Sequence, residues 1–458
     1  MTEEGNLSDP FDSLMEALMN PRLTDGQVIY LRAGTHYLTE SVALARSDIT
    51  IQPYEGEVAR ILFKPTANNP IYLSINGSGV RFRNLEIGSE PTNRLSPVRG
   101  NHTGVQLGFI AINAPPPADG LFRNCTLHDL GTCYWYGSGG GVIFKDCLLY
   151  NFGWPVETGE TDGEYLYTQN AASYDMKYVE NCLFGPSFSV GFQVYAESLA
   201  ADGSCRATHY TFDRCAWFHT FPFVVAAGVV DDINFLDCCA WNSDLIIGST
   251  DKTEGKYTLS DCWWSNGVEA NDDPQFGTFA ESDVQNNRLA TINPLGRYFY
   301  HPAVDATWGA AAGRIWDDNE YHGAAAITFP NGQTFAQWQA NTGYDANSTI
   351  SPLLPLANWV RLFPCAELPR IAHVVIYNWA QDNNVTVDFS SLNLANGSYR
   401  LRNAYDPLVD YTDIVYSGGG TISVPMAGRT IATPLAYATP LASLDSRFGA
   451  FVLELLES

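Results

Sequence analysis

The chain has 458 residues, of which 45% are hydrophobic and 16% charged, and its 39 glycines and 13% aromatic residues are typical of an all-β protein with many turns. Fifty acidic residues against 25 basic ones give a net charge of −25. This charge argues against nucleic-acid binding and against binding to anionic membranes, because both require positive charge. No apolar run approaches the roughly 18 residues that a membrane span needs, so we expect no membrane insertion.

The N-terminal residues 9–20 predict a short amphipathic helix. Ser8 or Asp9 is a suitable N-cap. The apolar residues recur at helical spacing at Leu7, Phe11, Leu14, Met15 and Leu18. Short alternating strands follow at 25–37, 49–51, 61–63, 71–73 and 80–87, and a long loop is expected from Gly88 to Gly120. The helix is therefore expected to cap the open end of the strands behind it, which would otherwise expose their edges.

From Gly120 to Gly267 one phrase recurs six times, with an apolar residue, a polar turn residue and then a cysteine. The six copies are Phe122-Arg-Asn-Cys125, Phe144-Lys-Asp-Cys147, Val179-Glu-Asn-Cys182, Phe212-Asp-Arg-Cys215, Phe235-Leu-Asp-Cys238 and Leu259-Ser-Asp-Cys262. The steps between these cysteines are 22, 35, 33, 23 and 24 residues. A unit of this length that cannot bury its own apolar face indicates a solenoid, in which neighbouring units build the core together.

No helical period runs through these units, so a parallel β-helix fits better than leucine-rich or ankyrin repeats. The cysteines are then expected to stack inside as small apolar side chains, with the preceding Asn or Asp at a bend. Adjacent Cys238 and Cys239 should point to opposite faces of one strand. Close cysteine pairs of the CxxC kind are absent, which argues against zinc and disulfide frameworks.

A second strand-like run follows five of the cysteines, at 133–136, 164–167, 191–195, 221–225 and 244–247. The gap before the second of these runs is the longest, and it contains Trp154, Glu157, Glu160 and Asp162. An acidic loop is therefore predicted to protrude between two strands of the second ladder.

The C-terminal part of the chain predicts a separate antiparallel domain. Residues 335–348 are expected to form a terminal coil with a short helix. Six short strands separated by turns lie within 371–458, which is typical of a small sandwich. We therefore predict an all-β fold with a right-handed parallel β-helix and capping helix in 1–350, a proline-containing linker in 351–370 and a C-terminal β-sandwich in 371–458.

Six stretches carry a family resemblance: Gly5-Asn-Leu-Ser-Asp-Pro-Phe11, residues 25–37, Tyr54-Glu-Gly-Glu57, Tyr167-Thr-Gln-Asn170, residues 338–348 and Val374-Val-Ile-Tyr-Asn-Trp379. On these residues the chain resembles secreted right-handed parallel β-helix proteins of the pectate-lyase-like superfamily that end in a small β-sandwich. That superfamily includes polysaccharide lyases, glycoside hydrolases, epimerases and phage tailspikes, so the resemblance implies the architecture more than the activity. Its members carry His and Gly where this chain has Glu164 and Tyr165, and this departure argues against His-dependent chemistry.

The acidic loop is the candidate catalytic site. Hydrolysis of a glycosidic bond needs two carboxylates, and Glu160, Asp162 and Glu164 are the candidates. The residues expected to stack on sugar rings or to bind hydroxyls are Trp154, Tyr165, Tyr167, Gln169, Asn170 and Tyr195. The alternatives are a solvated acidic turn or a calcium site built from hard oxygen ligands.

A polysaccharide lyase is a second enzymatic interpretation, with Lys252 as the best candidate base. Lys145 and Lys177 precede ladder cysteines and are expected to be structural. We rank the lyase below the hydrolase, because the net charge opposes a polyanionic substrate. His128 and His219 lie at similar places after ladder cysteines, which favours a polar stack over a metal site.

These features predict an extracellular carbohydrate-binding protein, with carbohydrate cleavage of the glycoside hydrolase kind as the further expectation. Its expected partner is a polysaccharide or cell-surface glycan, and no cofactor is required, with calcium as an optional one. Its rival is a non-enzymatic structural or adhesive protein, such as a phage tail or virion-surface component, with a possible homotrimer or virion partners. Met1-Thr-Glu-Glu-Gly does not resemble a signal peptide, so we expect either a removed leader or export by another route, such as on a virus particle.

Overall fold

The computed structural model describes residues 10–456 except for a set of internal segments. These segments are 66–68, 93, 95–103, 108–115, 137–139, 156–160, 163–165, 170–175, 189–190, 197–205, 221, 227–228, 244, 249–252, 267–274, 277, 293–312, 324–328, 330–331, 366–370, 393 and 419. None of the helices within the described ranges is long and apolar enough to cross a membrane.

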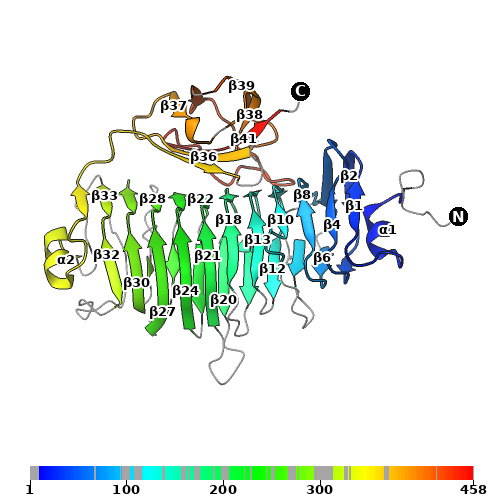
Figure 1. The fold of residues 1–458 in the computed structure, drawn as a ribbon, viewed down its shortest axis with the longest axis horizontal. Helices are drawn as coiled ribbons and strands as arrows, with labels where there is room; N and C mark the ends of the chain where they lie inside the picture. The colour runs from blue at the N-terminus through cyan, green and yellow to red at the C-terminus, as the bar shows by residue number, and fades with distance from the viewer. Residues whose placement is uncertain are drawn as a thin grey trace.

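The main body is a right-handed parallel β-helix in which successive strands enter three sheets in turn (Figure 1). Sheet 1 contains β1 (Val28–Leu31), β4 (Thr50–Pro53), β7 (Arg81–Arg83), β10 (Phe122–Arg123), β13 (Gly141–Lys145), β18 (Lys177–Glu180), β21 (Arg206–Asp213), β24 (Val229–Leu236), β27 (Thr253–Ser260), β30 (Thr278–Gln285) and β32 (Arg314–Asp317). Sheet 2 contains β2 (Gly34–Leu38), β5 (Ala59–Phe63), β8 (Glu86–Ser89), β11 (Thr126–His128), β14 (Leu148–Tyr150), β19 (Leu183–Phe184), β22 (Ala216–Phe218), β25 (Cys239–Trp241), β28 (Trp263–Asn266), β31 (Arg288–Thr291), β33 (Glu320–Gly323) and β34 (Thr349–Ser351). Sheet 3 contains β3 (Val42–Leu44), β6 (Tyr72–Ile75), β9 (Gly104–Leu107), β12 (Thr132–Tyr136), β17 (Leu166–Gln169), β20 (Phe192–Ala196), β23 (Pro222–Ala226), β26 (Ile246–Ile247) and β29 (Gln275–Phe276). The expected loop of residues 88–120 thus contains a strand, β9.

The predicted cysteine ladder is confirmed. The six cysteines lie in the solenoid core, and all six are at most 2% exposed. Each follows a residue in the left-handed region, with φ values of 49° at Asn124, 56° at Asp146 and 54° at Arg214, for example. Asn and Asp tolerate this conformation better than other non-glycine residues, which explains why they precede most of the cysteines. Beyond Cys262 the ladder position is taken by asparagine.

Helices cover both ends of the solenoid (Figure 1). At the N-terminal end, α1 (Leu14–Met19) begins later than predicted, because the Ser13 hydroxyl accepts a hydrogen bond from the Glu16 amide at 3.1 Å and caps the helix. The predicted start at residue 9 is therefore wrong. At the other end, α2 (Phe335–Thr342) begins in a capping box at Thr334, and its buried Trp338 donates to Asp345 at 2.8 Å.

The C-terminal sandwich consists of a five-stranded antiparallel sheet facing a two-stranded one. In order, the five strands are β35 (Trp359–Pro364), β36 (Ile371–Tyr377), β41 (Phe448–Leu455), β38 (Gly397–Asn403) and β39 (Tyr411–Tyr416), and the other two are β37 (Asn384–Asp388) and β40 (Thr421–Pro425). A short 3-10 helix, η2 (Ser390–Leu392), follows β37. All six strands predicted in this region are present. The seventh, β35, lies inside the predicted linker, because residues 359–363 contain no proline and pair along β36.

The sandwich packs against the side of the solenoid, over sheet 2 (Figure 1). Outward residues of β14 to β31, including Leu148, Leu183, Ala216, Cys239 and Trp263, form one buried cluster with Trp359, Phe363, Val375, Tyr377 and Phe448 of the sandwich. Cys238 lies in the solenoid core, whereas Cys239 lies in this interface, which confirms that the adjacent pair faces opposite sides. The strands of sheet 2 therefore have two apolar faces. One builds the solenoid core, and the other binds the C-terminal sandwich.

Candidate functional site

One register row of sheet 3 aligns residues across nine coils, and seven of the nine are polar or aromatic. Consecutive backbone partners in this row are Ala43, Ser74, Gln106, Tyr134, Tyr167, Gln193, Phe223, Ile246 and Gln275. None of these residue types carries a charge. Neighbouring strands of a sheet lie about 4.8 Å apart, so the row presents one position per coil along the solenoid axis.

The described side chains of this row lie on the face of sheet 3 that is turned away from the core. Ala43 is exposed, and Ser74, Gln193 and Ile246 are half-buried. The described residues that alternate with the row are buried. Val42 is 7% exposed, and the others are at most 2% exposed: Leu44, Leu73, Ile75, Cys133, Trp135, Phe192 and Ile247. Because side chains alternate between the two faces of a strand, the row belongs to the outer face.

The predicted residues Tyr167, Gln169 and Tyr195 occupy positions on this outer face. Gln169 pairs with Tyr136, two residues beyond the first row, and Tyr195 pairs with Val225. Tyr134, Tyr136 and Gln193 were not among the site residues predicted from the sequence. The signal for the two tyrosines was present in the alternation of Cys133-Tyr-Trp-Tyr136, in which the buried Cys133 and Trp135 flank Tyr134.

The acidic loop begins and ends in a small antiparallel ladder. β15 (Trp154–Pro155) pairs with β16 (Thr161–Asp162), and Trp154 lies opposite Asp162 in register. The Trp154 ring is 1% exposed and has the Arg94 guanidinium over it at 5.2 Å. A ring so deeply buried presents no face on which a sugar can stack, so we leave Trp154 out of the candidate site.

Four of the predicted site residues lie outside the described part of the chain: Glu160, Glu164, Tyr165 and Asn170. The candidate lyase base, Lys252, does so as well. Lys145 forms an ion pair with Glu180 at 2.9 Å, and Lys177 is 1% exposed and lies over the Tyr210 ring at 5.1 Å. Both described lysines are therefore held by structural contacts.

A buried charged cluster lies at the sheet 2 to sheet 3 bend. His128 bonds Asp129 at 2.7 Å and Glu86 at 3.3 Å, and Arg94, which is fully buried, forms an ion pair with Asp129. Burial disfavours the charged imidazole, but hydrogen bonds to Asp129 and Glu86 outweigh it and raise the pKa of His128 to about 9. The Leu435 amide of the C-terminal sandwich also donates to Asp129, at 2.8 Å, so this cluster holds the two domains together.

Two other histidines lie near the interface between the solenoid and the sandwich. His219 is 5.8 Å from Tyr405 between ring centroids and bonds Asn242 at 2.9 Å. Burial lowers its pKa to about 4, although nearby Asp445 opposes this shift. His373 on β36 is 1% exposed, and burial lowers its pKa to about 3. His128 and His219 thus have separate partners and do not form one polar stack.

Within the described ranges, no group of three or more His, Cys, Asp or Glu side chains is arranged to hold a metal ion. Calcium binding, if it involves the acidic loop, would use residues of which several lie outside those ranges. The described candidate site therefore consists of the outer face of sheet 3, with polar and aromatic residue types in register.

No protein-family model matches the chain, and no curated protein matches it either. Among solved structures, the chain is similar to ORF18 of Geobacillus virus E2, with 11% sequence identity and a TM-score of 0.33. That alignment covers 90% of this chain and 74% of the viral protein.

Proposed function

We propose that the chain is an extracellular carbohydrate-binding protein whose glycan site is the outer face of sheet 3. The observation that supports this proposal is the backbone register that aligns Tyr134, Tyr167 and Gln193 on the face opposite the core. Tyrosine rings provide flat apolar faces for the C–H faces of sugars, and side-chain amides both donate and accept hydrogen bonds with hydroxyls.

The charge of the chain favours a neutral polysaccharide or cell-surface glycan. The register row contains no acidic or basic residue, and the whole chain carries −25. A polyanionic glycan would be repelled by this field and would need bridging cations, such as calcium. The same argument disfavours nucleic acid as a partner.

Cleavage of the bound glycan is a further part of the proposal, with Glu160, Asp162 and Glu164 as the acids. Asp162 ends β16, and β17 begins at Leu166 and contributes Tyr167 to the proposed face. A hydrolase needs two of these carboxylates on either side of the scissile bond. A lyase would instead need a base such as Lys252 and is ranked second.

A structural or adhesive virion component is the second candidate function, favoured by the long regular stack of coils with helices covering both ends. Such a protein would bind a glycan without releasing products, and it would be expected to form a trimer or to bind other virion proteins. A free enzyme would be expected to be monomeric. The molar mass in solution therefore helps to separate the two candidates.

The test of binding is affinity electrophoresis in gels containing neutral or acidic polysaccharides. We expect Tyr167→Ala and Tyr134→Ala to lose retardation by at least one neutral glycan. The control is Tyr178→Ala, a half-buried tyrosine of β18 in sheet 1, which should leave retardation unchanged. Equal retardation of all three variants, or no retardation of the wild type by any glycan, would refute the proposed site.

The test of cleavage is product release from the same polysaccharides, with and without calcium. The comparison is between the wild type and a Glu160→Gln, Asp162→Asn, Glu164→Gln triple variant. New reducing ends without unsaturated products, lost in the variant, would establish a hydrolase, whereas unsaturated products would establish a lyase. Binding without release of any product would support the adhesive function.

A further inference from the structure

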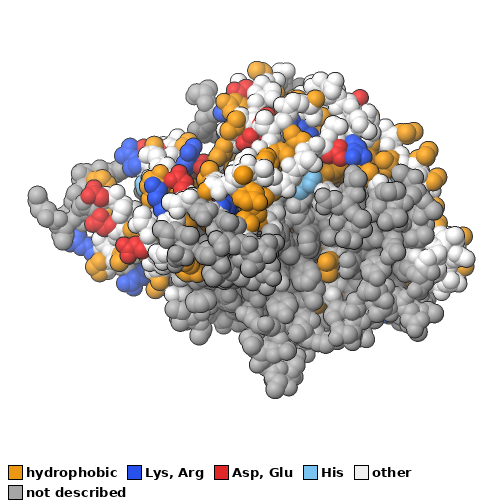
Figure 2. Space-filling view, turned by 180° about the vertical axis from the view of Figure 1, so that it is seen from behind, with side chains coloured by type: hydrophobic (Ala, Val, Ile, Leu, Met, Phe, Trp, Pro, Cys, Tyr) orange, Lys and Arg blue, Asp and Glu red, His pale blue; other side chains and the backbone are white. Residues whose placement is uncertain are grey.

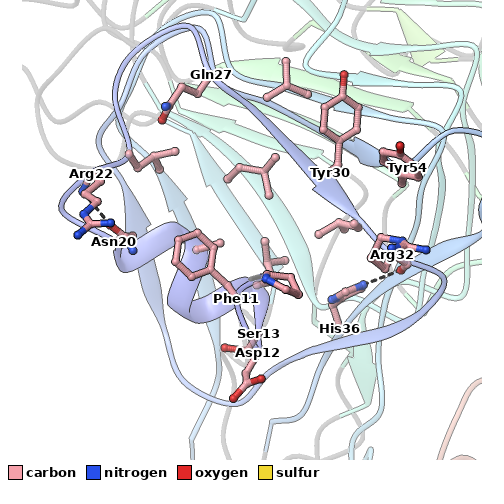
Figure 3. Close-up of a pocket in the computed structure, with 17 residues that line it drawn as sticks. Phe11, Asp12, Ser13, Asn20, Arg22, Gln27, Tyr30, Arg32, His36 and Tyr54 are labelled. Carbon is pink, nitrogen blue, oxygen red and sulfur yellow. Dashed lines mark hydrogen bonds between the residues drawn. The ribbon is translucent and has the colours of Figure 1, made fainter. Parts of the chain in front are cut away.

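A cavity of about 710 Å³ lies at the N-terminal end of the solenoid, between α1 and β1 (Figure 3). Three residues of the solenoid core, Leu14, Leu23 and Leu31, line it together with Phe11. α1 packs mainly against β2 and β3, and it has only six residues. The helix therefore leaves space beside β1, at the open edge of sheet 1.

The edge of β1 carries backbone groups without a partner strand. The Gln27 and Leu31 carbonyls accept hydrogen bonds from the Thr50 and Tyr54 amides, at 3.0 and 2.8 Å. Because backbone groups of successive strand residues point to opposite edges, the N–H and C=O groups of Val28 and Tyr30 point to the other edge. Within the described residues, β1 pairs with β4 alone and no backbone hydrogen bond reaches that edge.

The side chains beside this edge are unusually exposed for their type. Val28 is 42% exposed and Tyr30 is 50% exposed, on a strand whose Leu31 is buried. An unpaired, apolar strand edge is a template for pairing with another chain, and proteins normally cover it. Here the edge and the adjoining cavity together form a groove.

Three charged side chains line the groove, Arg22, Arg32 and Asp12, and Arg22 is the one that can pair with an acidic occupant. Arg22 and Arg32 lie on opposite sides of the cavity (Figure 3). Acidic and basic side chains are interspersed on the N-terminal coils (Figure 2), and Arg32 pairs with Glu57 at 2.6 Å. Arg22 forms no ion pair with any described residue, although the chain as a whole carries −25.

We propose that this groove is a docking site for an extended segment of a partner polypeptide that carries a carboxylate. The segment adds a strand to sheet 1 by hydrogen-bonding the Val28 and Tyr30 backbones, places an apolar side chain in the cavity and directs its carboxylate to Arg22. A sheet edge recognises the regular N–H and C=O groups of a polypeptide, which a glycan lacks. The site is separate from the outer face of sheet 3 and does not depend on glycan binding.

The test begins with selection of peptides from a random 12-residue library on the full chain, followed by affinity measurement with fluorescently labelled peptides. We expect selected peptides to contain alternating apolar residues and an acidic residue. The discriminating variant is Tyr30→Pro, because it removes an N–H from the open edge without removing a hydrogen bond to β4. It should weaken binding at least tenfold, whereas Tyr30→Ala, which keeps the N–H, should weaken it less.

Two further measurements complete the test. Arg22→Glu should weaken the binding of acidic peptides at least tenfold. Arg60→Glu on β5 is the charge-matched control. Hydrogen exchange should show new protection of the Val28 and Tyr30 amides on peptide addition. Peptides that bind Tyr30→Pro as tightly as the wild type would overturn the proposal. So would peptide binding that appears only after residues 1–9 are deleted, because the groove would then belong to the chain's own N-terminal segment.

Discussion

The outer faces of sheets 2 and 3 differ in chemistry although they are built by the same coils. In the middle coils, sheet 2 turns Leu183, Cys239 and Trp263 outward, and the C-terminal sandwich buries them. Sheet 3 places Tyr167 and Gln193 in its outer row, and the described members of that row remain exposed or half-buried. The core requires only the inner face of each strand to be apolar. The residue types on the outer face therefore determine whether that face can bind another domain or is available to a ligand.

The largest effect on stability is expected on the outer face of sheet 2, which the sandwich covers. Trp241 of β25 is 1% exposed and lies 5.3 Å from Phe448 and 5.8 Å from Trp379 of the sandwich, between ring centroids. Trp241→Ala should lower the free energy of unfolding by about 3–5 kcal/mol through the lost burial and the cavity left behind. Chemical denaturation measures this change, and Tyr30→Ala, at a tyrosine of β1 that is 50% exposed, is the aromatic control, with a smaller expected loss.

The same variant should also expose a thiol selectively. Burial raises the pKa of Cys239 to about 12, and Cys239 lies in the interface, whereas Cys238 lies in the solenoid core. If Trp241→Ala loosens the sandwich, a thiol reagent should modify Cys239 and leave Cys238 unmodified, as read by mass spectrometry of the labelled peptide. Equal labelling of both cysteines would mean that the solenoid itself has opened.

Lowering the pH should destabilise the interface between sheet 2 and the sandwich, with the second largest effect. Burial holds the pKa of His219 at about 4 and that of His373 at about 3, both below the ordinary histidine value of about 6.5. The contribution of the two neutral histidines to the free energy of unfolding is complete above about pH 6.5. It is lost as the pH falls towards their pKa values in the folded chain, because the unfolded chain takes up protons first. Between pH 6.5 and 5.0 the loss should be about 3 kcal/mol for the two histidines together.

Denaturation curves at several pH values measure this acid effect. In a His373→Phe variant, the free energy of unfolding should depend on pH about half as steeply, because His219 is then the only one of the two histidines that titrates. A slope that is unchanged in this variant would show that other groups cause the acid effect. Glycan retardation by the sheet 3 face should persist in the pH range where the sandwich is loosened.

The smallest expected effect comes from one hydroxyl group. The Tyr377 hydroxyl accepts a hydrogen bond from the Ala240 amide at 2.9 Å and donates to the Trp263 carbonyl at 2.7 Å. Tyr377→Phe keeps the ring in the interface but leaves these buried backbone groups without the hydroxyl, which should cost about 1–2 kcal/mol in the free energy of unfolding. A change within about 0.3 kcal/mol would show that water replaces the hydroxyl.

The solenoid and its inner core were predictable from local patterns in the chain. The recurring cysteine phrase defined the coil, and the Asn or Asp before five of the six cysteines marked the bend, because these residues tolerate a left-handed backbone. The opposite orientation of Cys238 and Cys239 followed from the two-residue period of a strand. Periodic signals of this kind need no knowledge of distant contacts.

The residues of the proposed site were harder to predict, because a sheet register links segments that are distant in sequence. Tyr134 and Tyr167 become neighbours only through the pairing of β12 with β17, across the inserted acidic loop. Trp154 illustrates the opposite error, since its sequence neighbours suggested an exposed loop, whereas Arg94 covers its ring. Acidic neighbours in the sequence do not by themselves place an aromatic residue on the surface.

The sequence by itself determined the parallel β-helix, the cysteine ladder and the six strands first predicted for the sandwich, since each depends on residue types repeated at fixed spacing. Only the tertiary structure decided where the sandwich packs, that β35 belongs to it and that the described side chains of the outer row on sheet 3 are exposed or half-buried. The physical reason is that two apolar faces that are distant in sequence attract each other without directionality, so their complementarity of shape, and not any local signal, determines their contact.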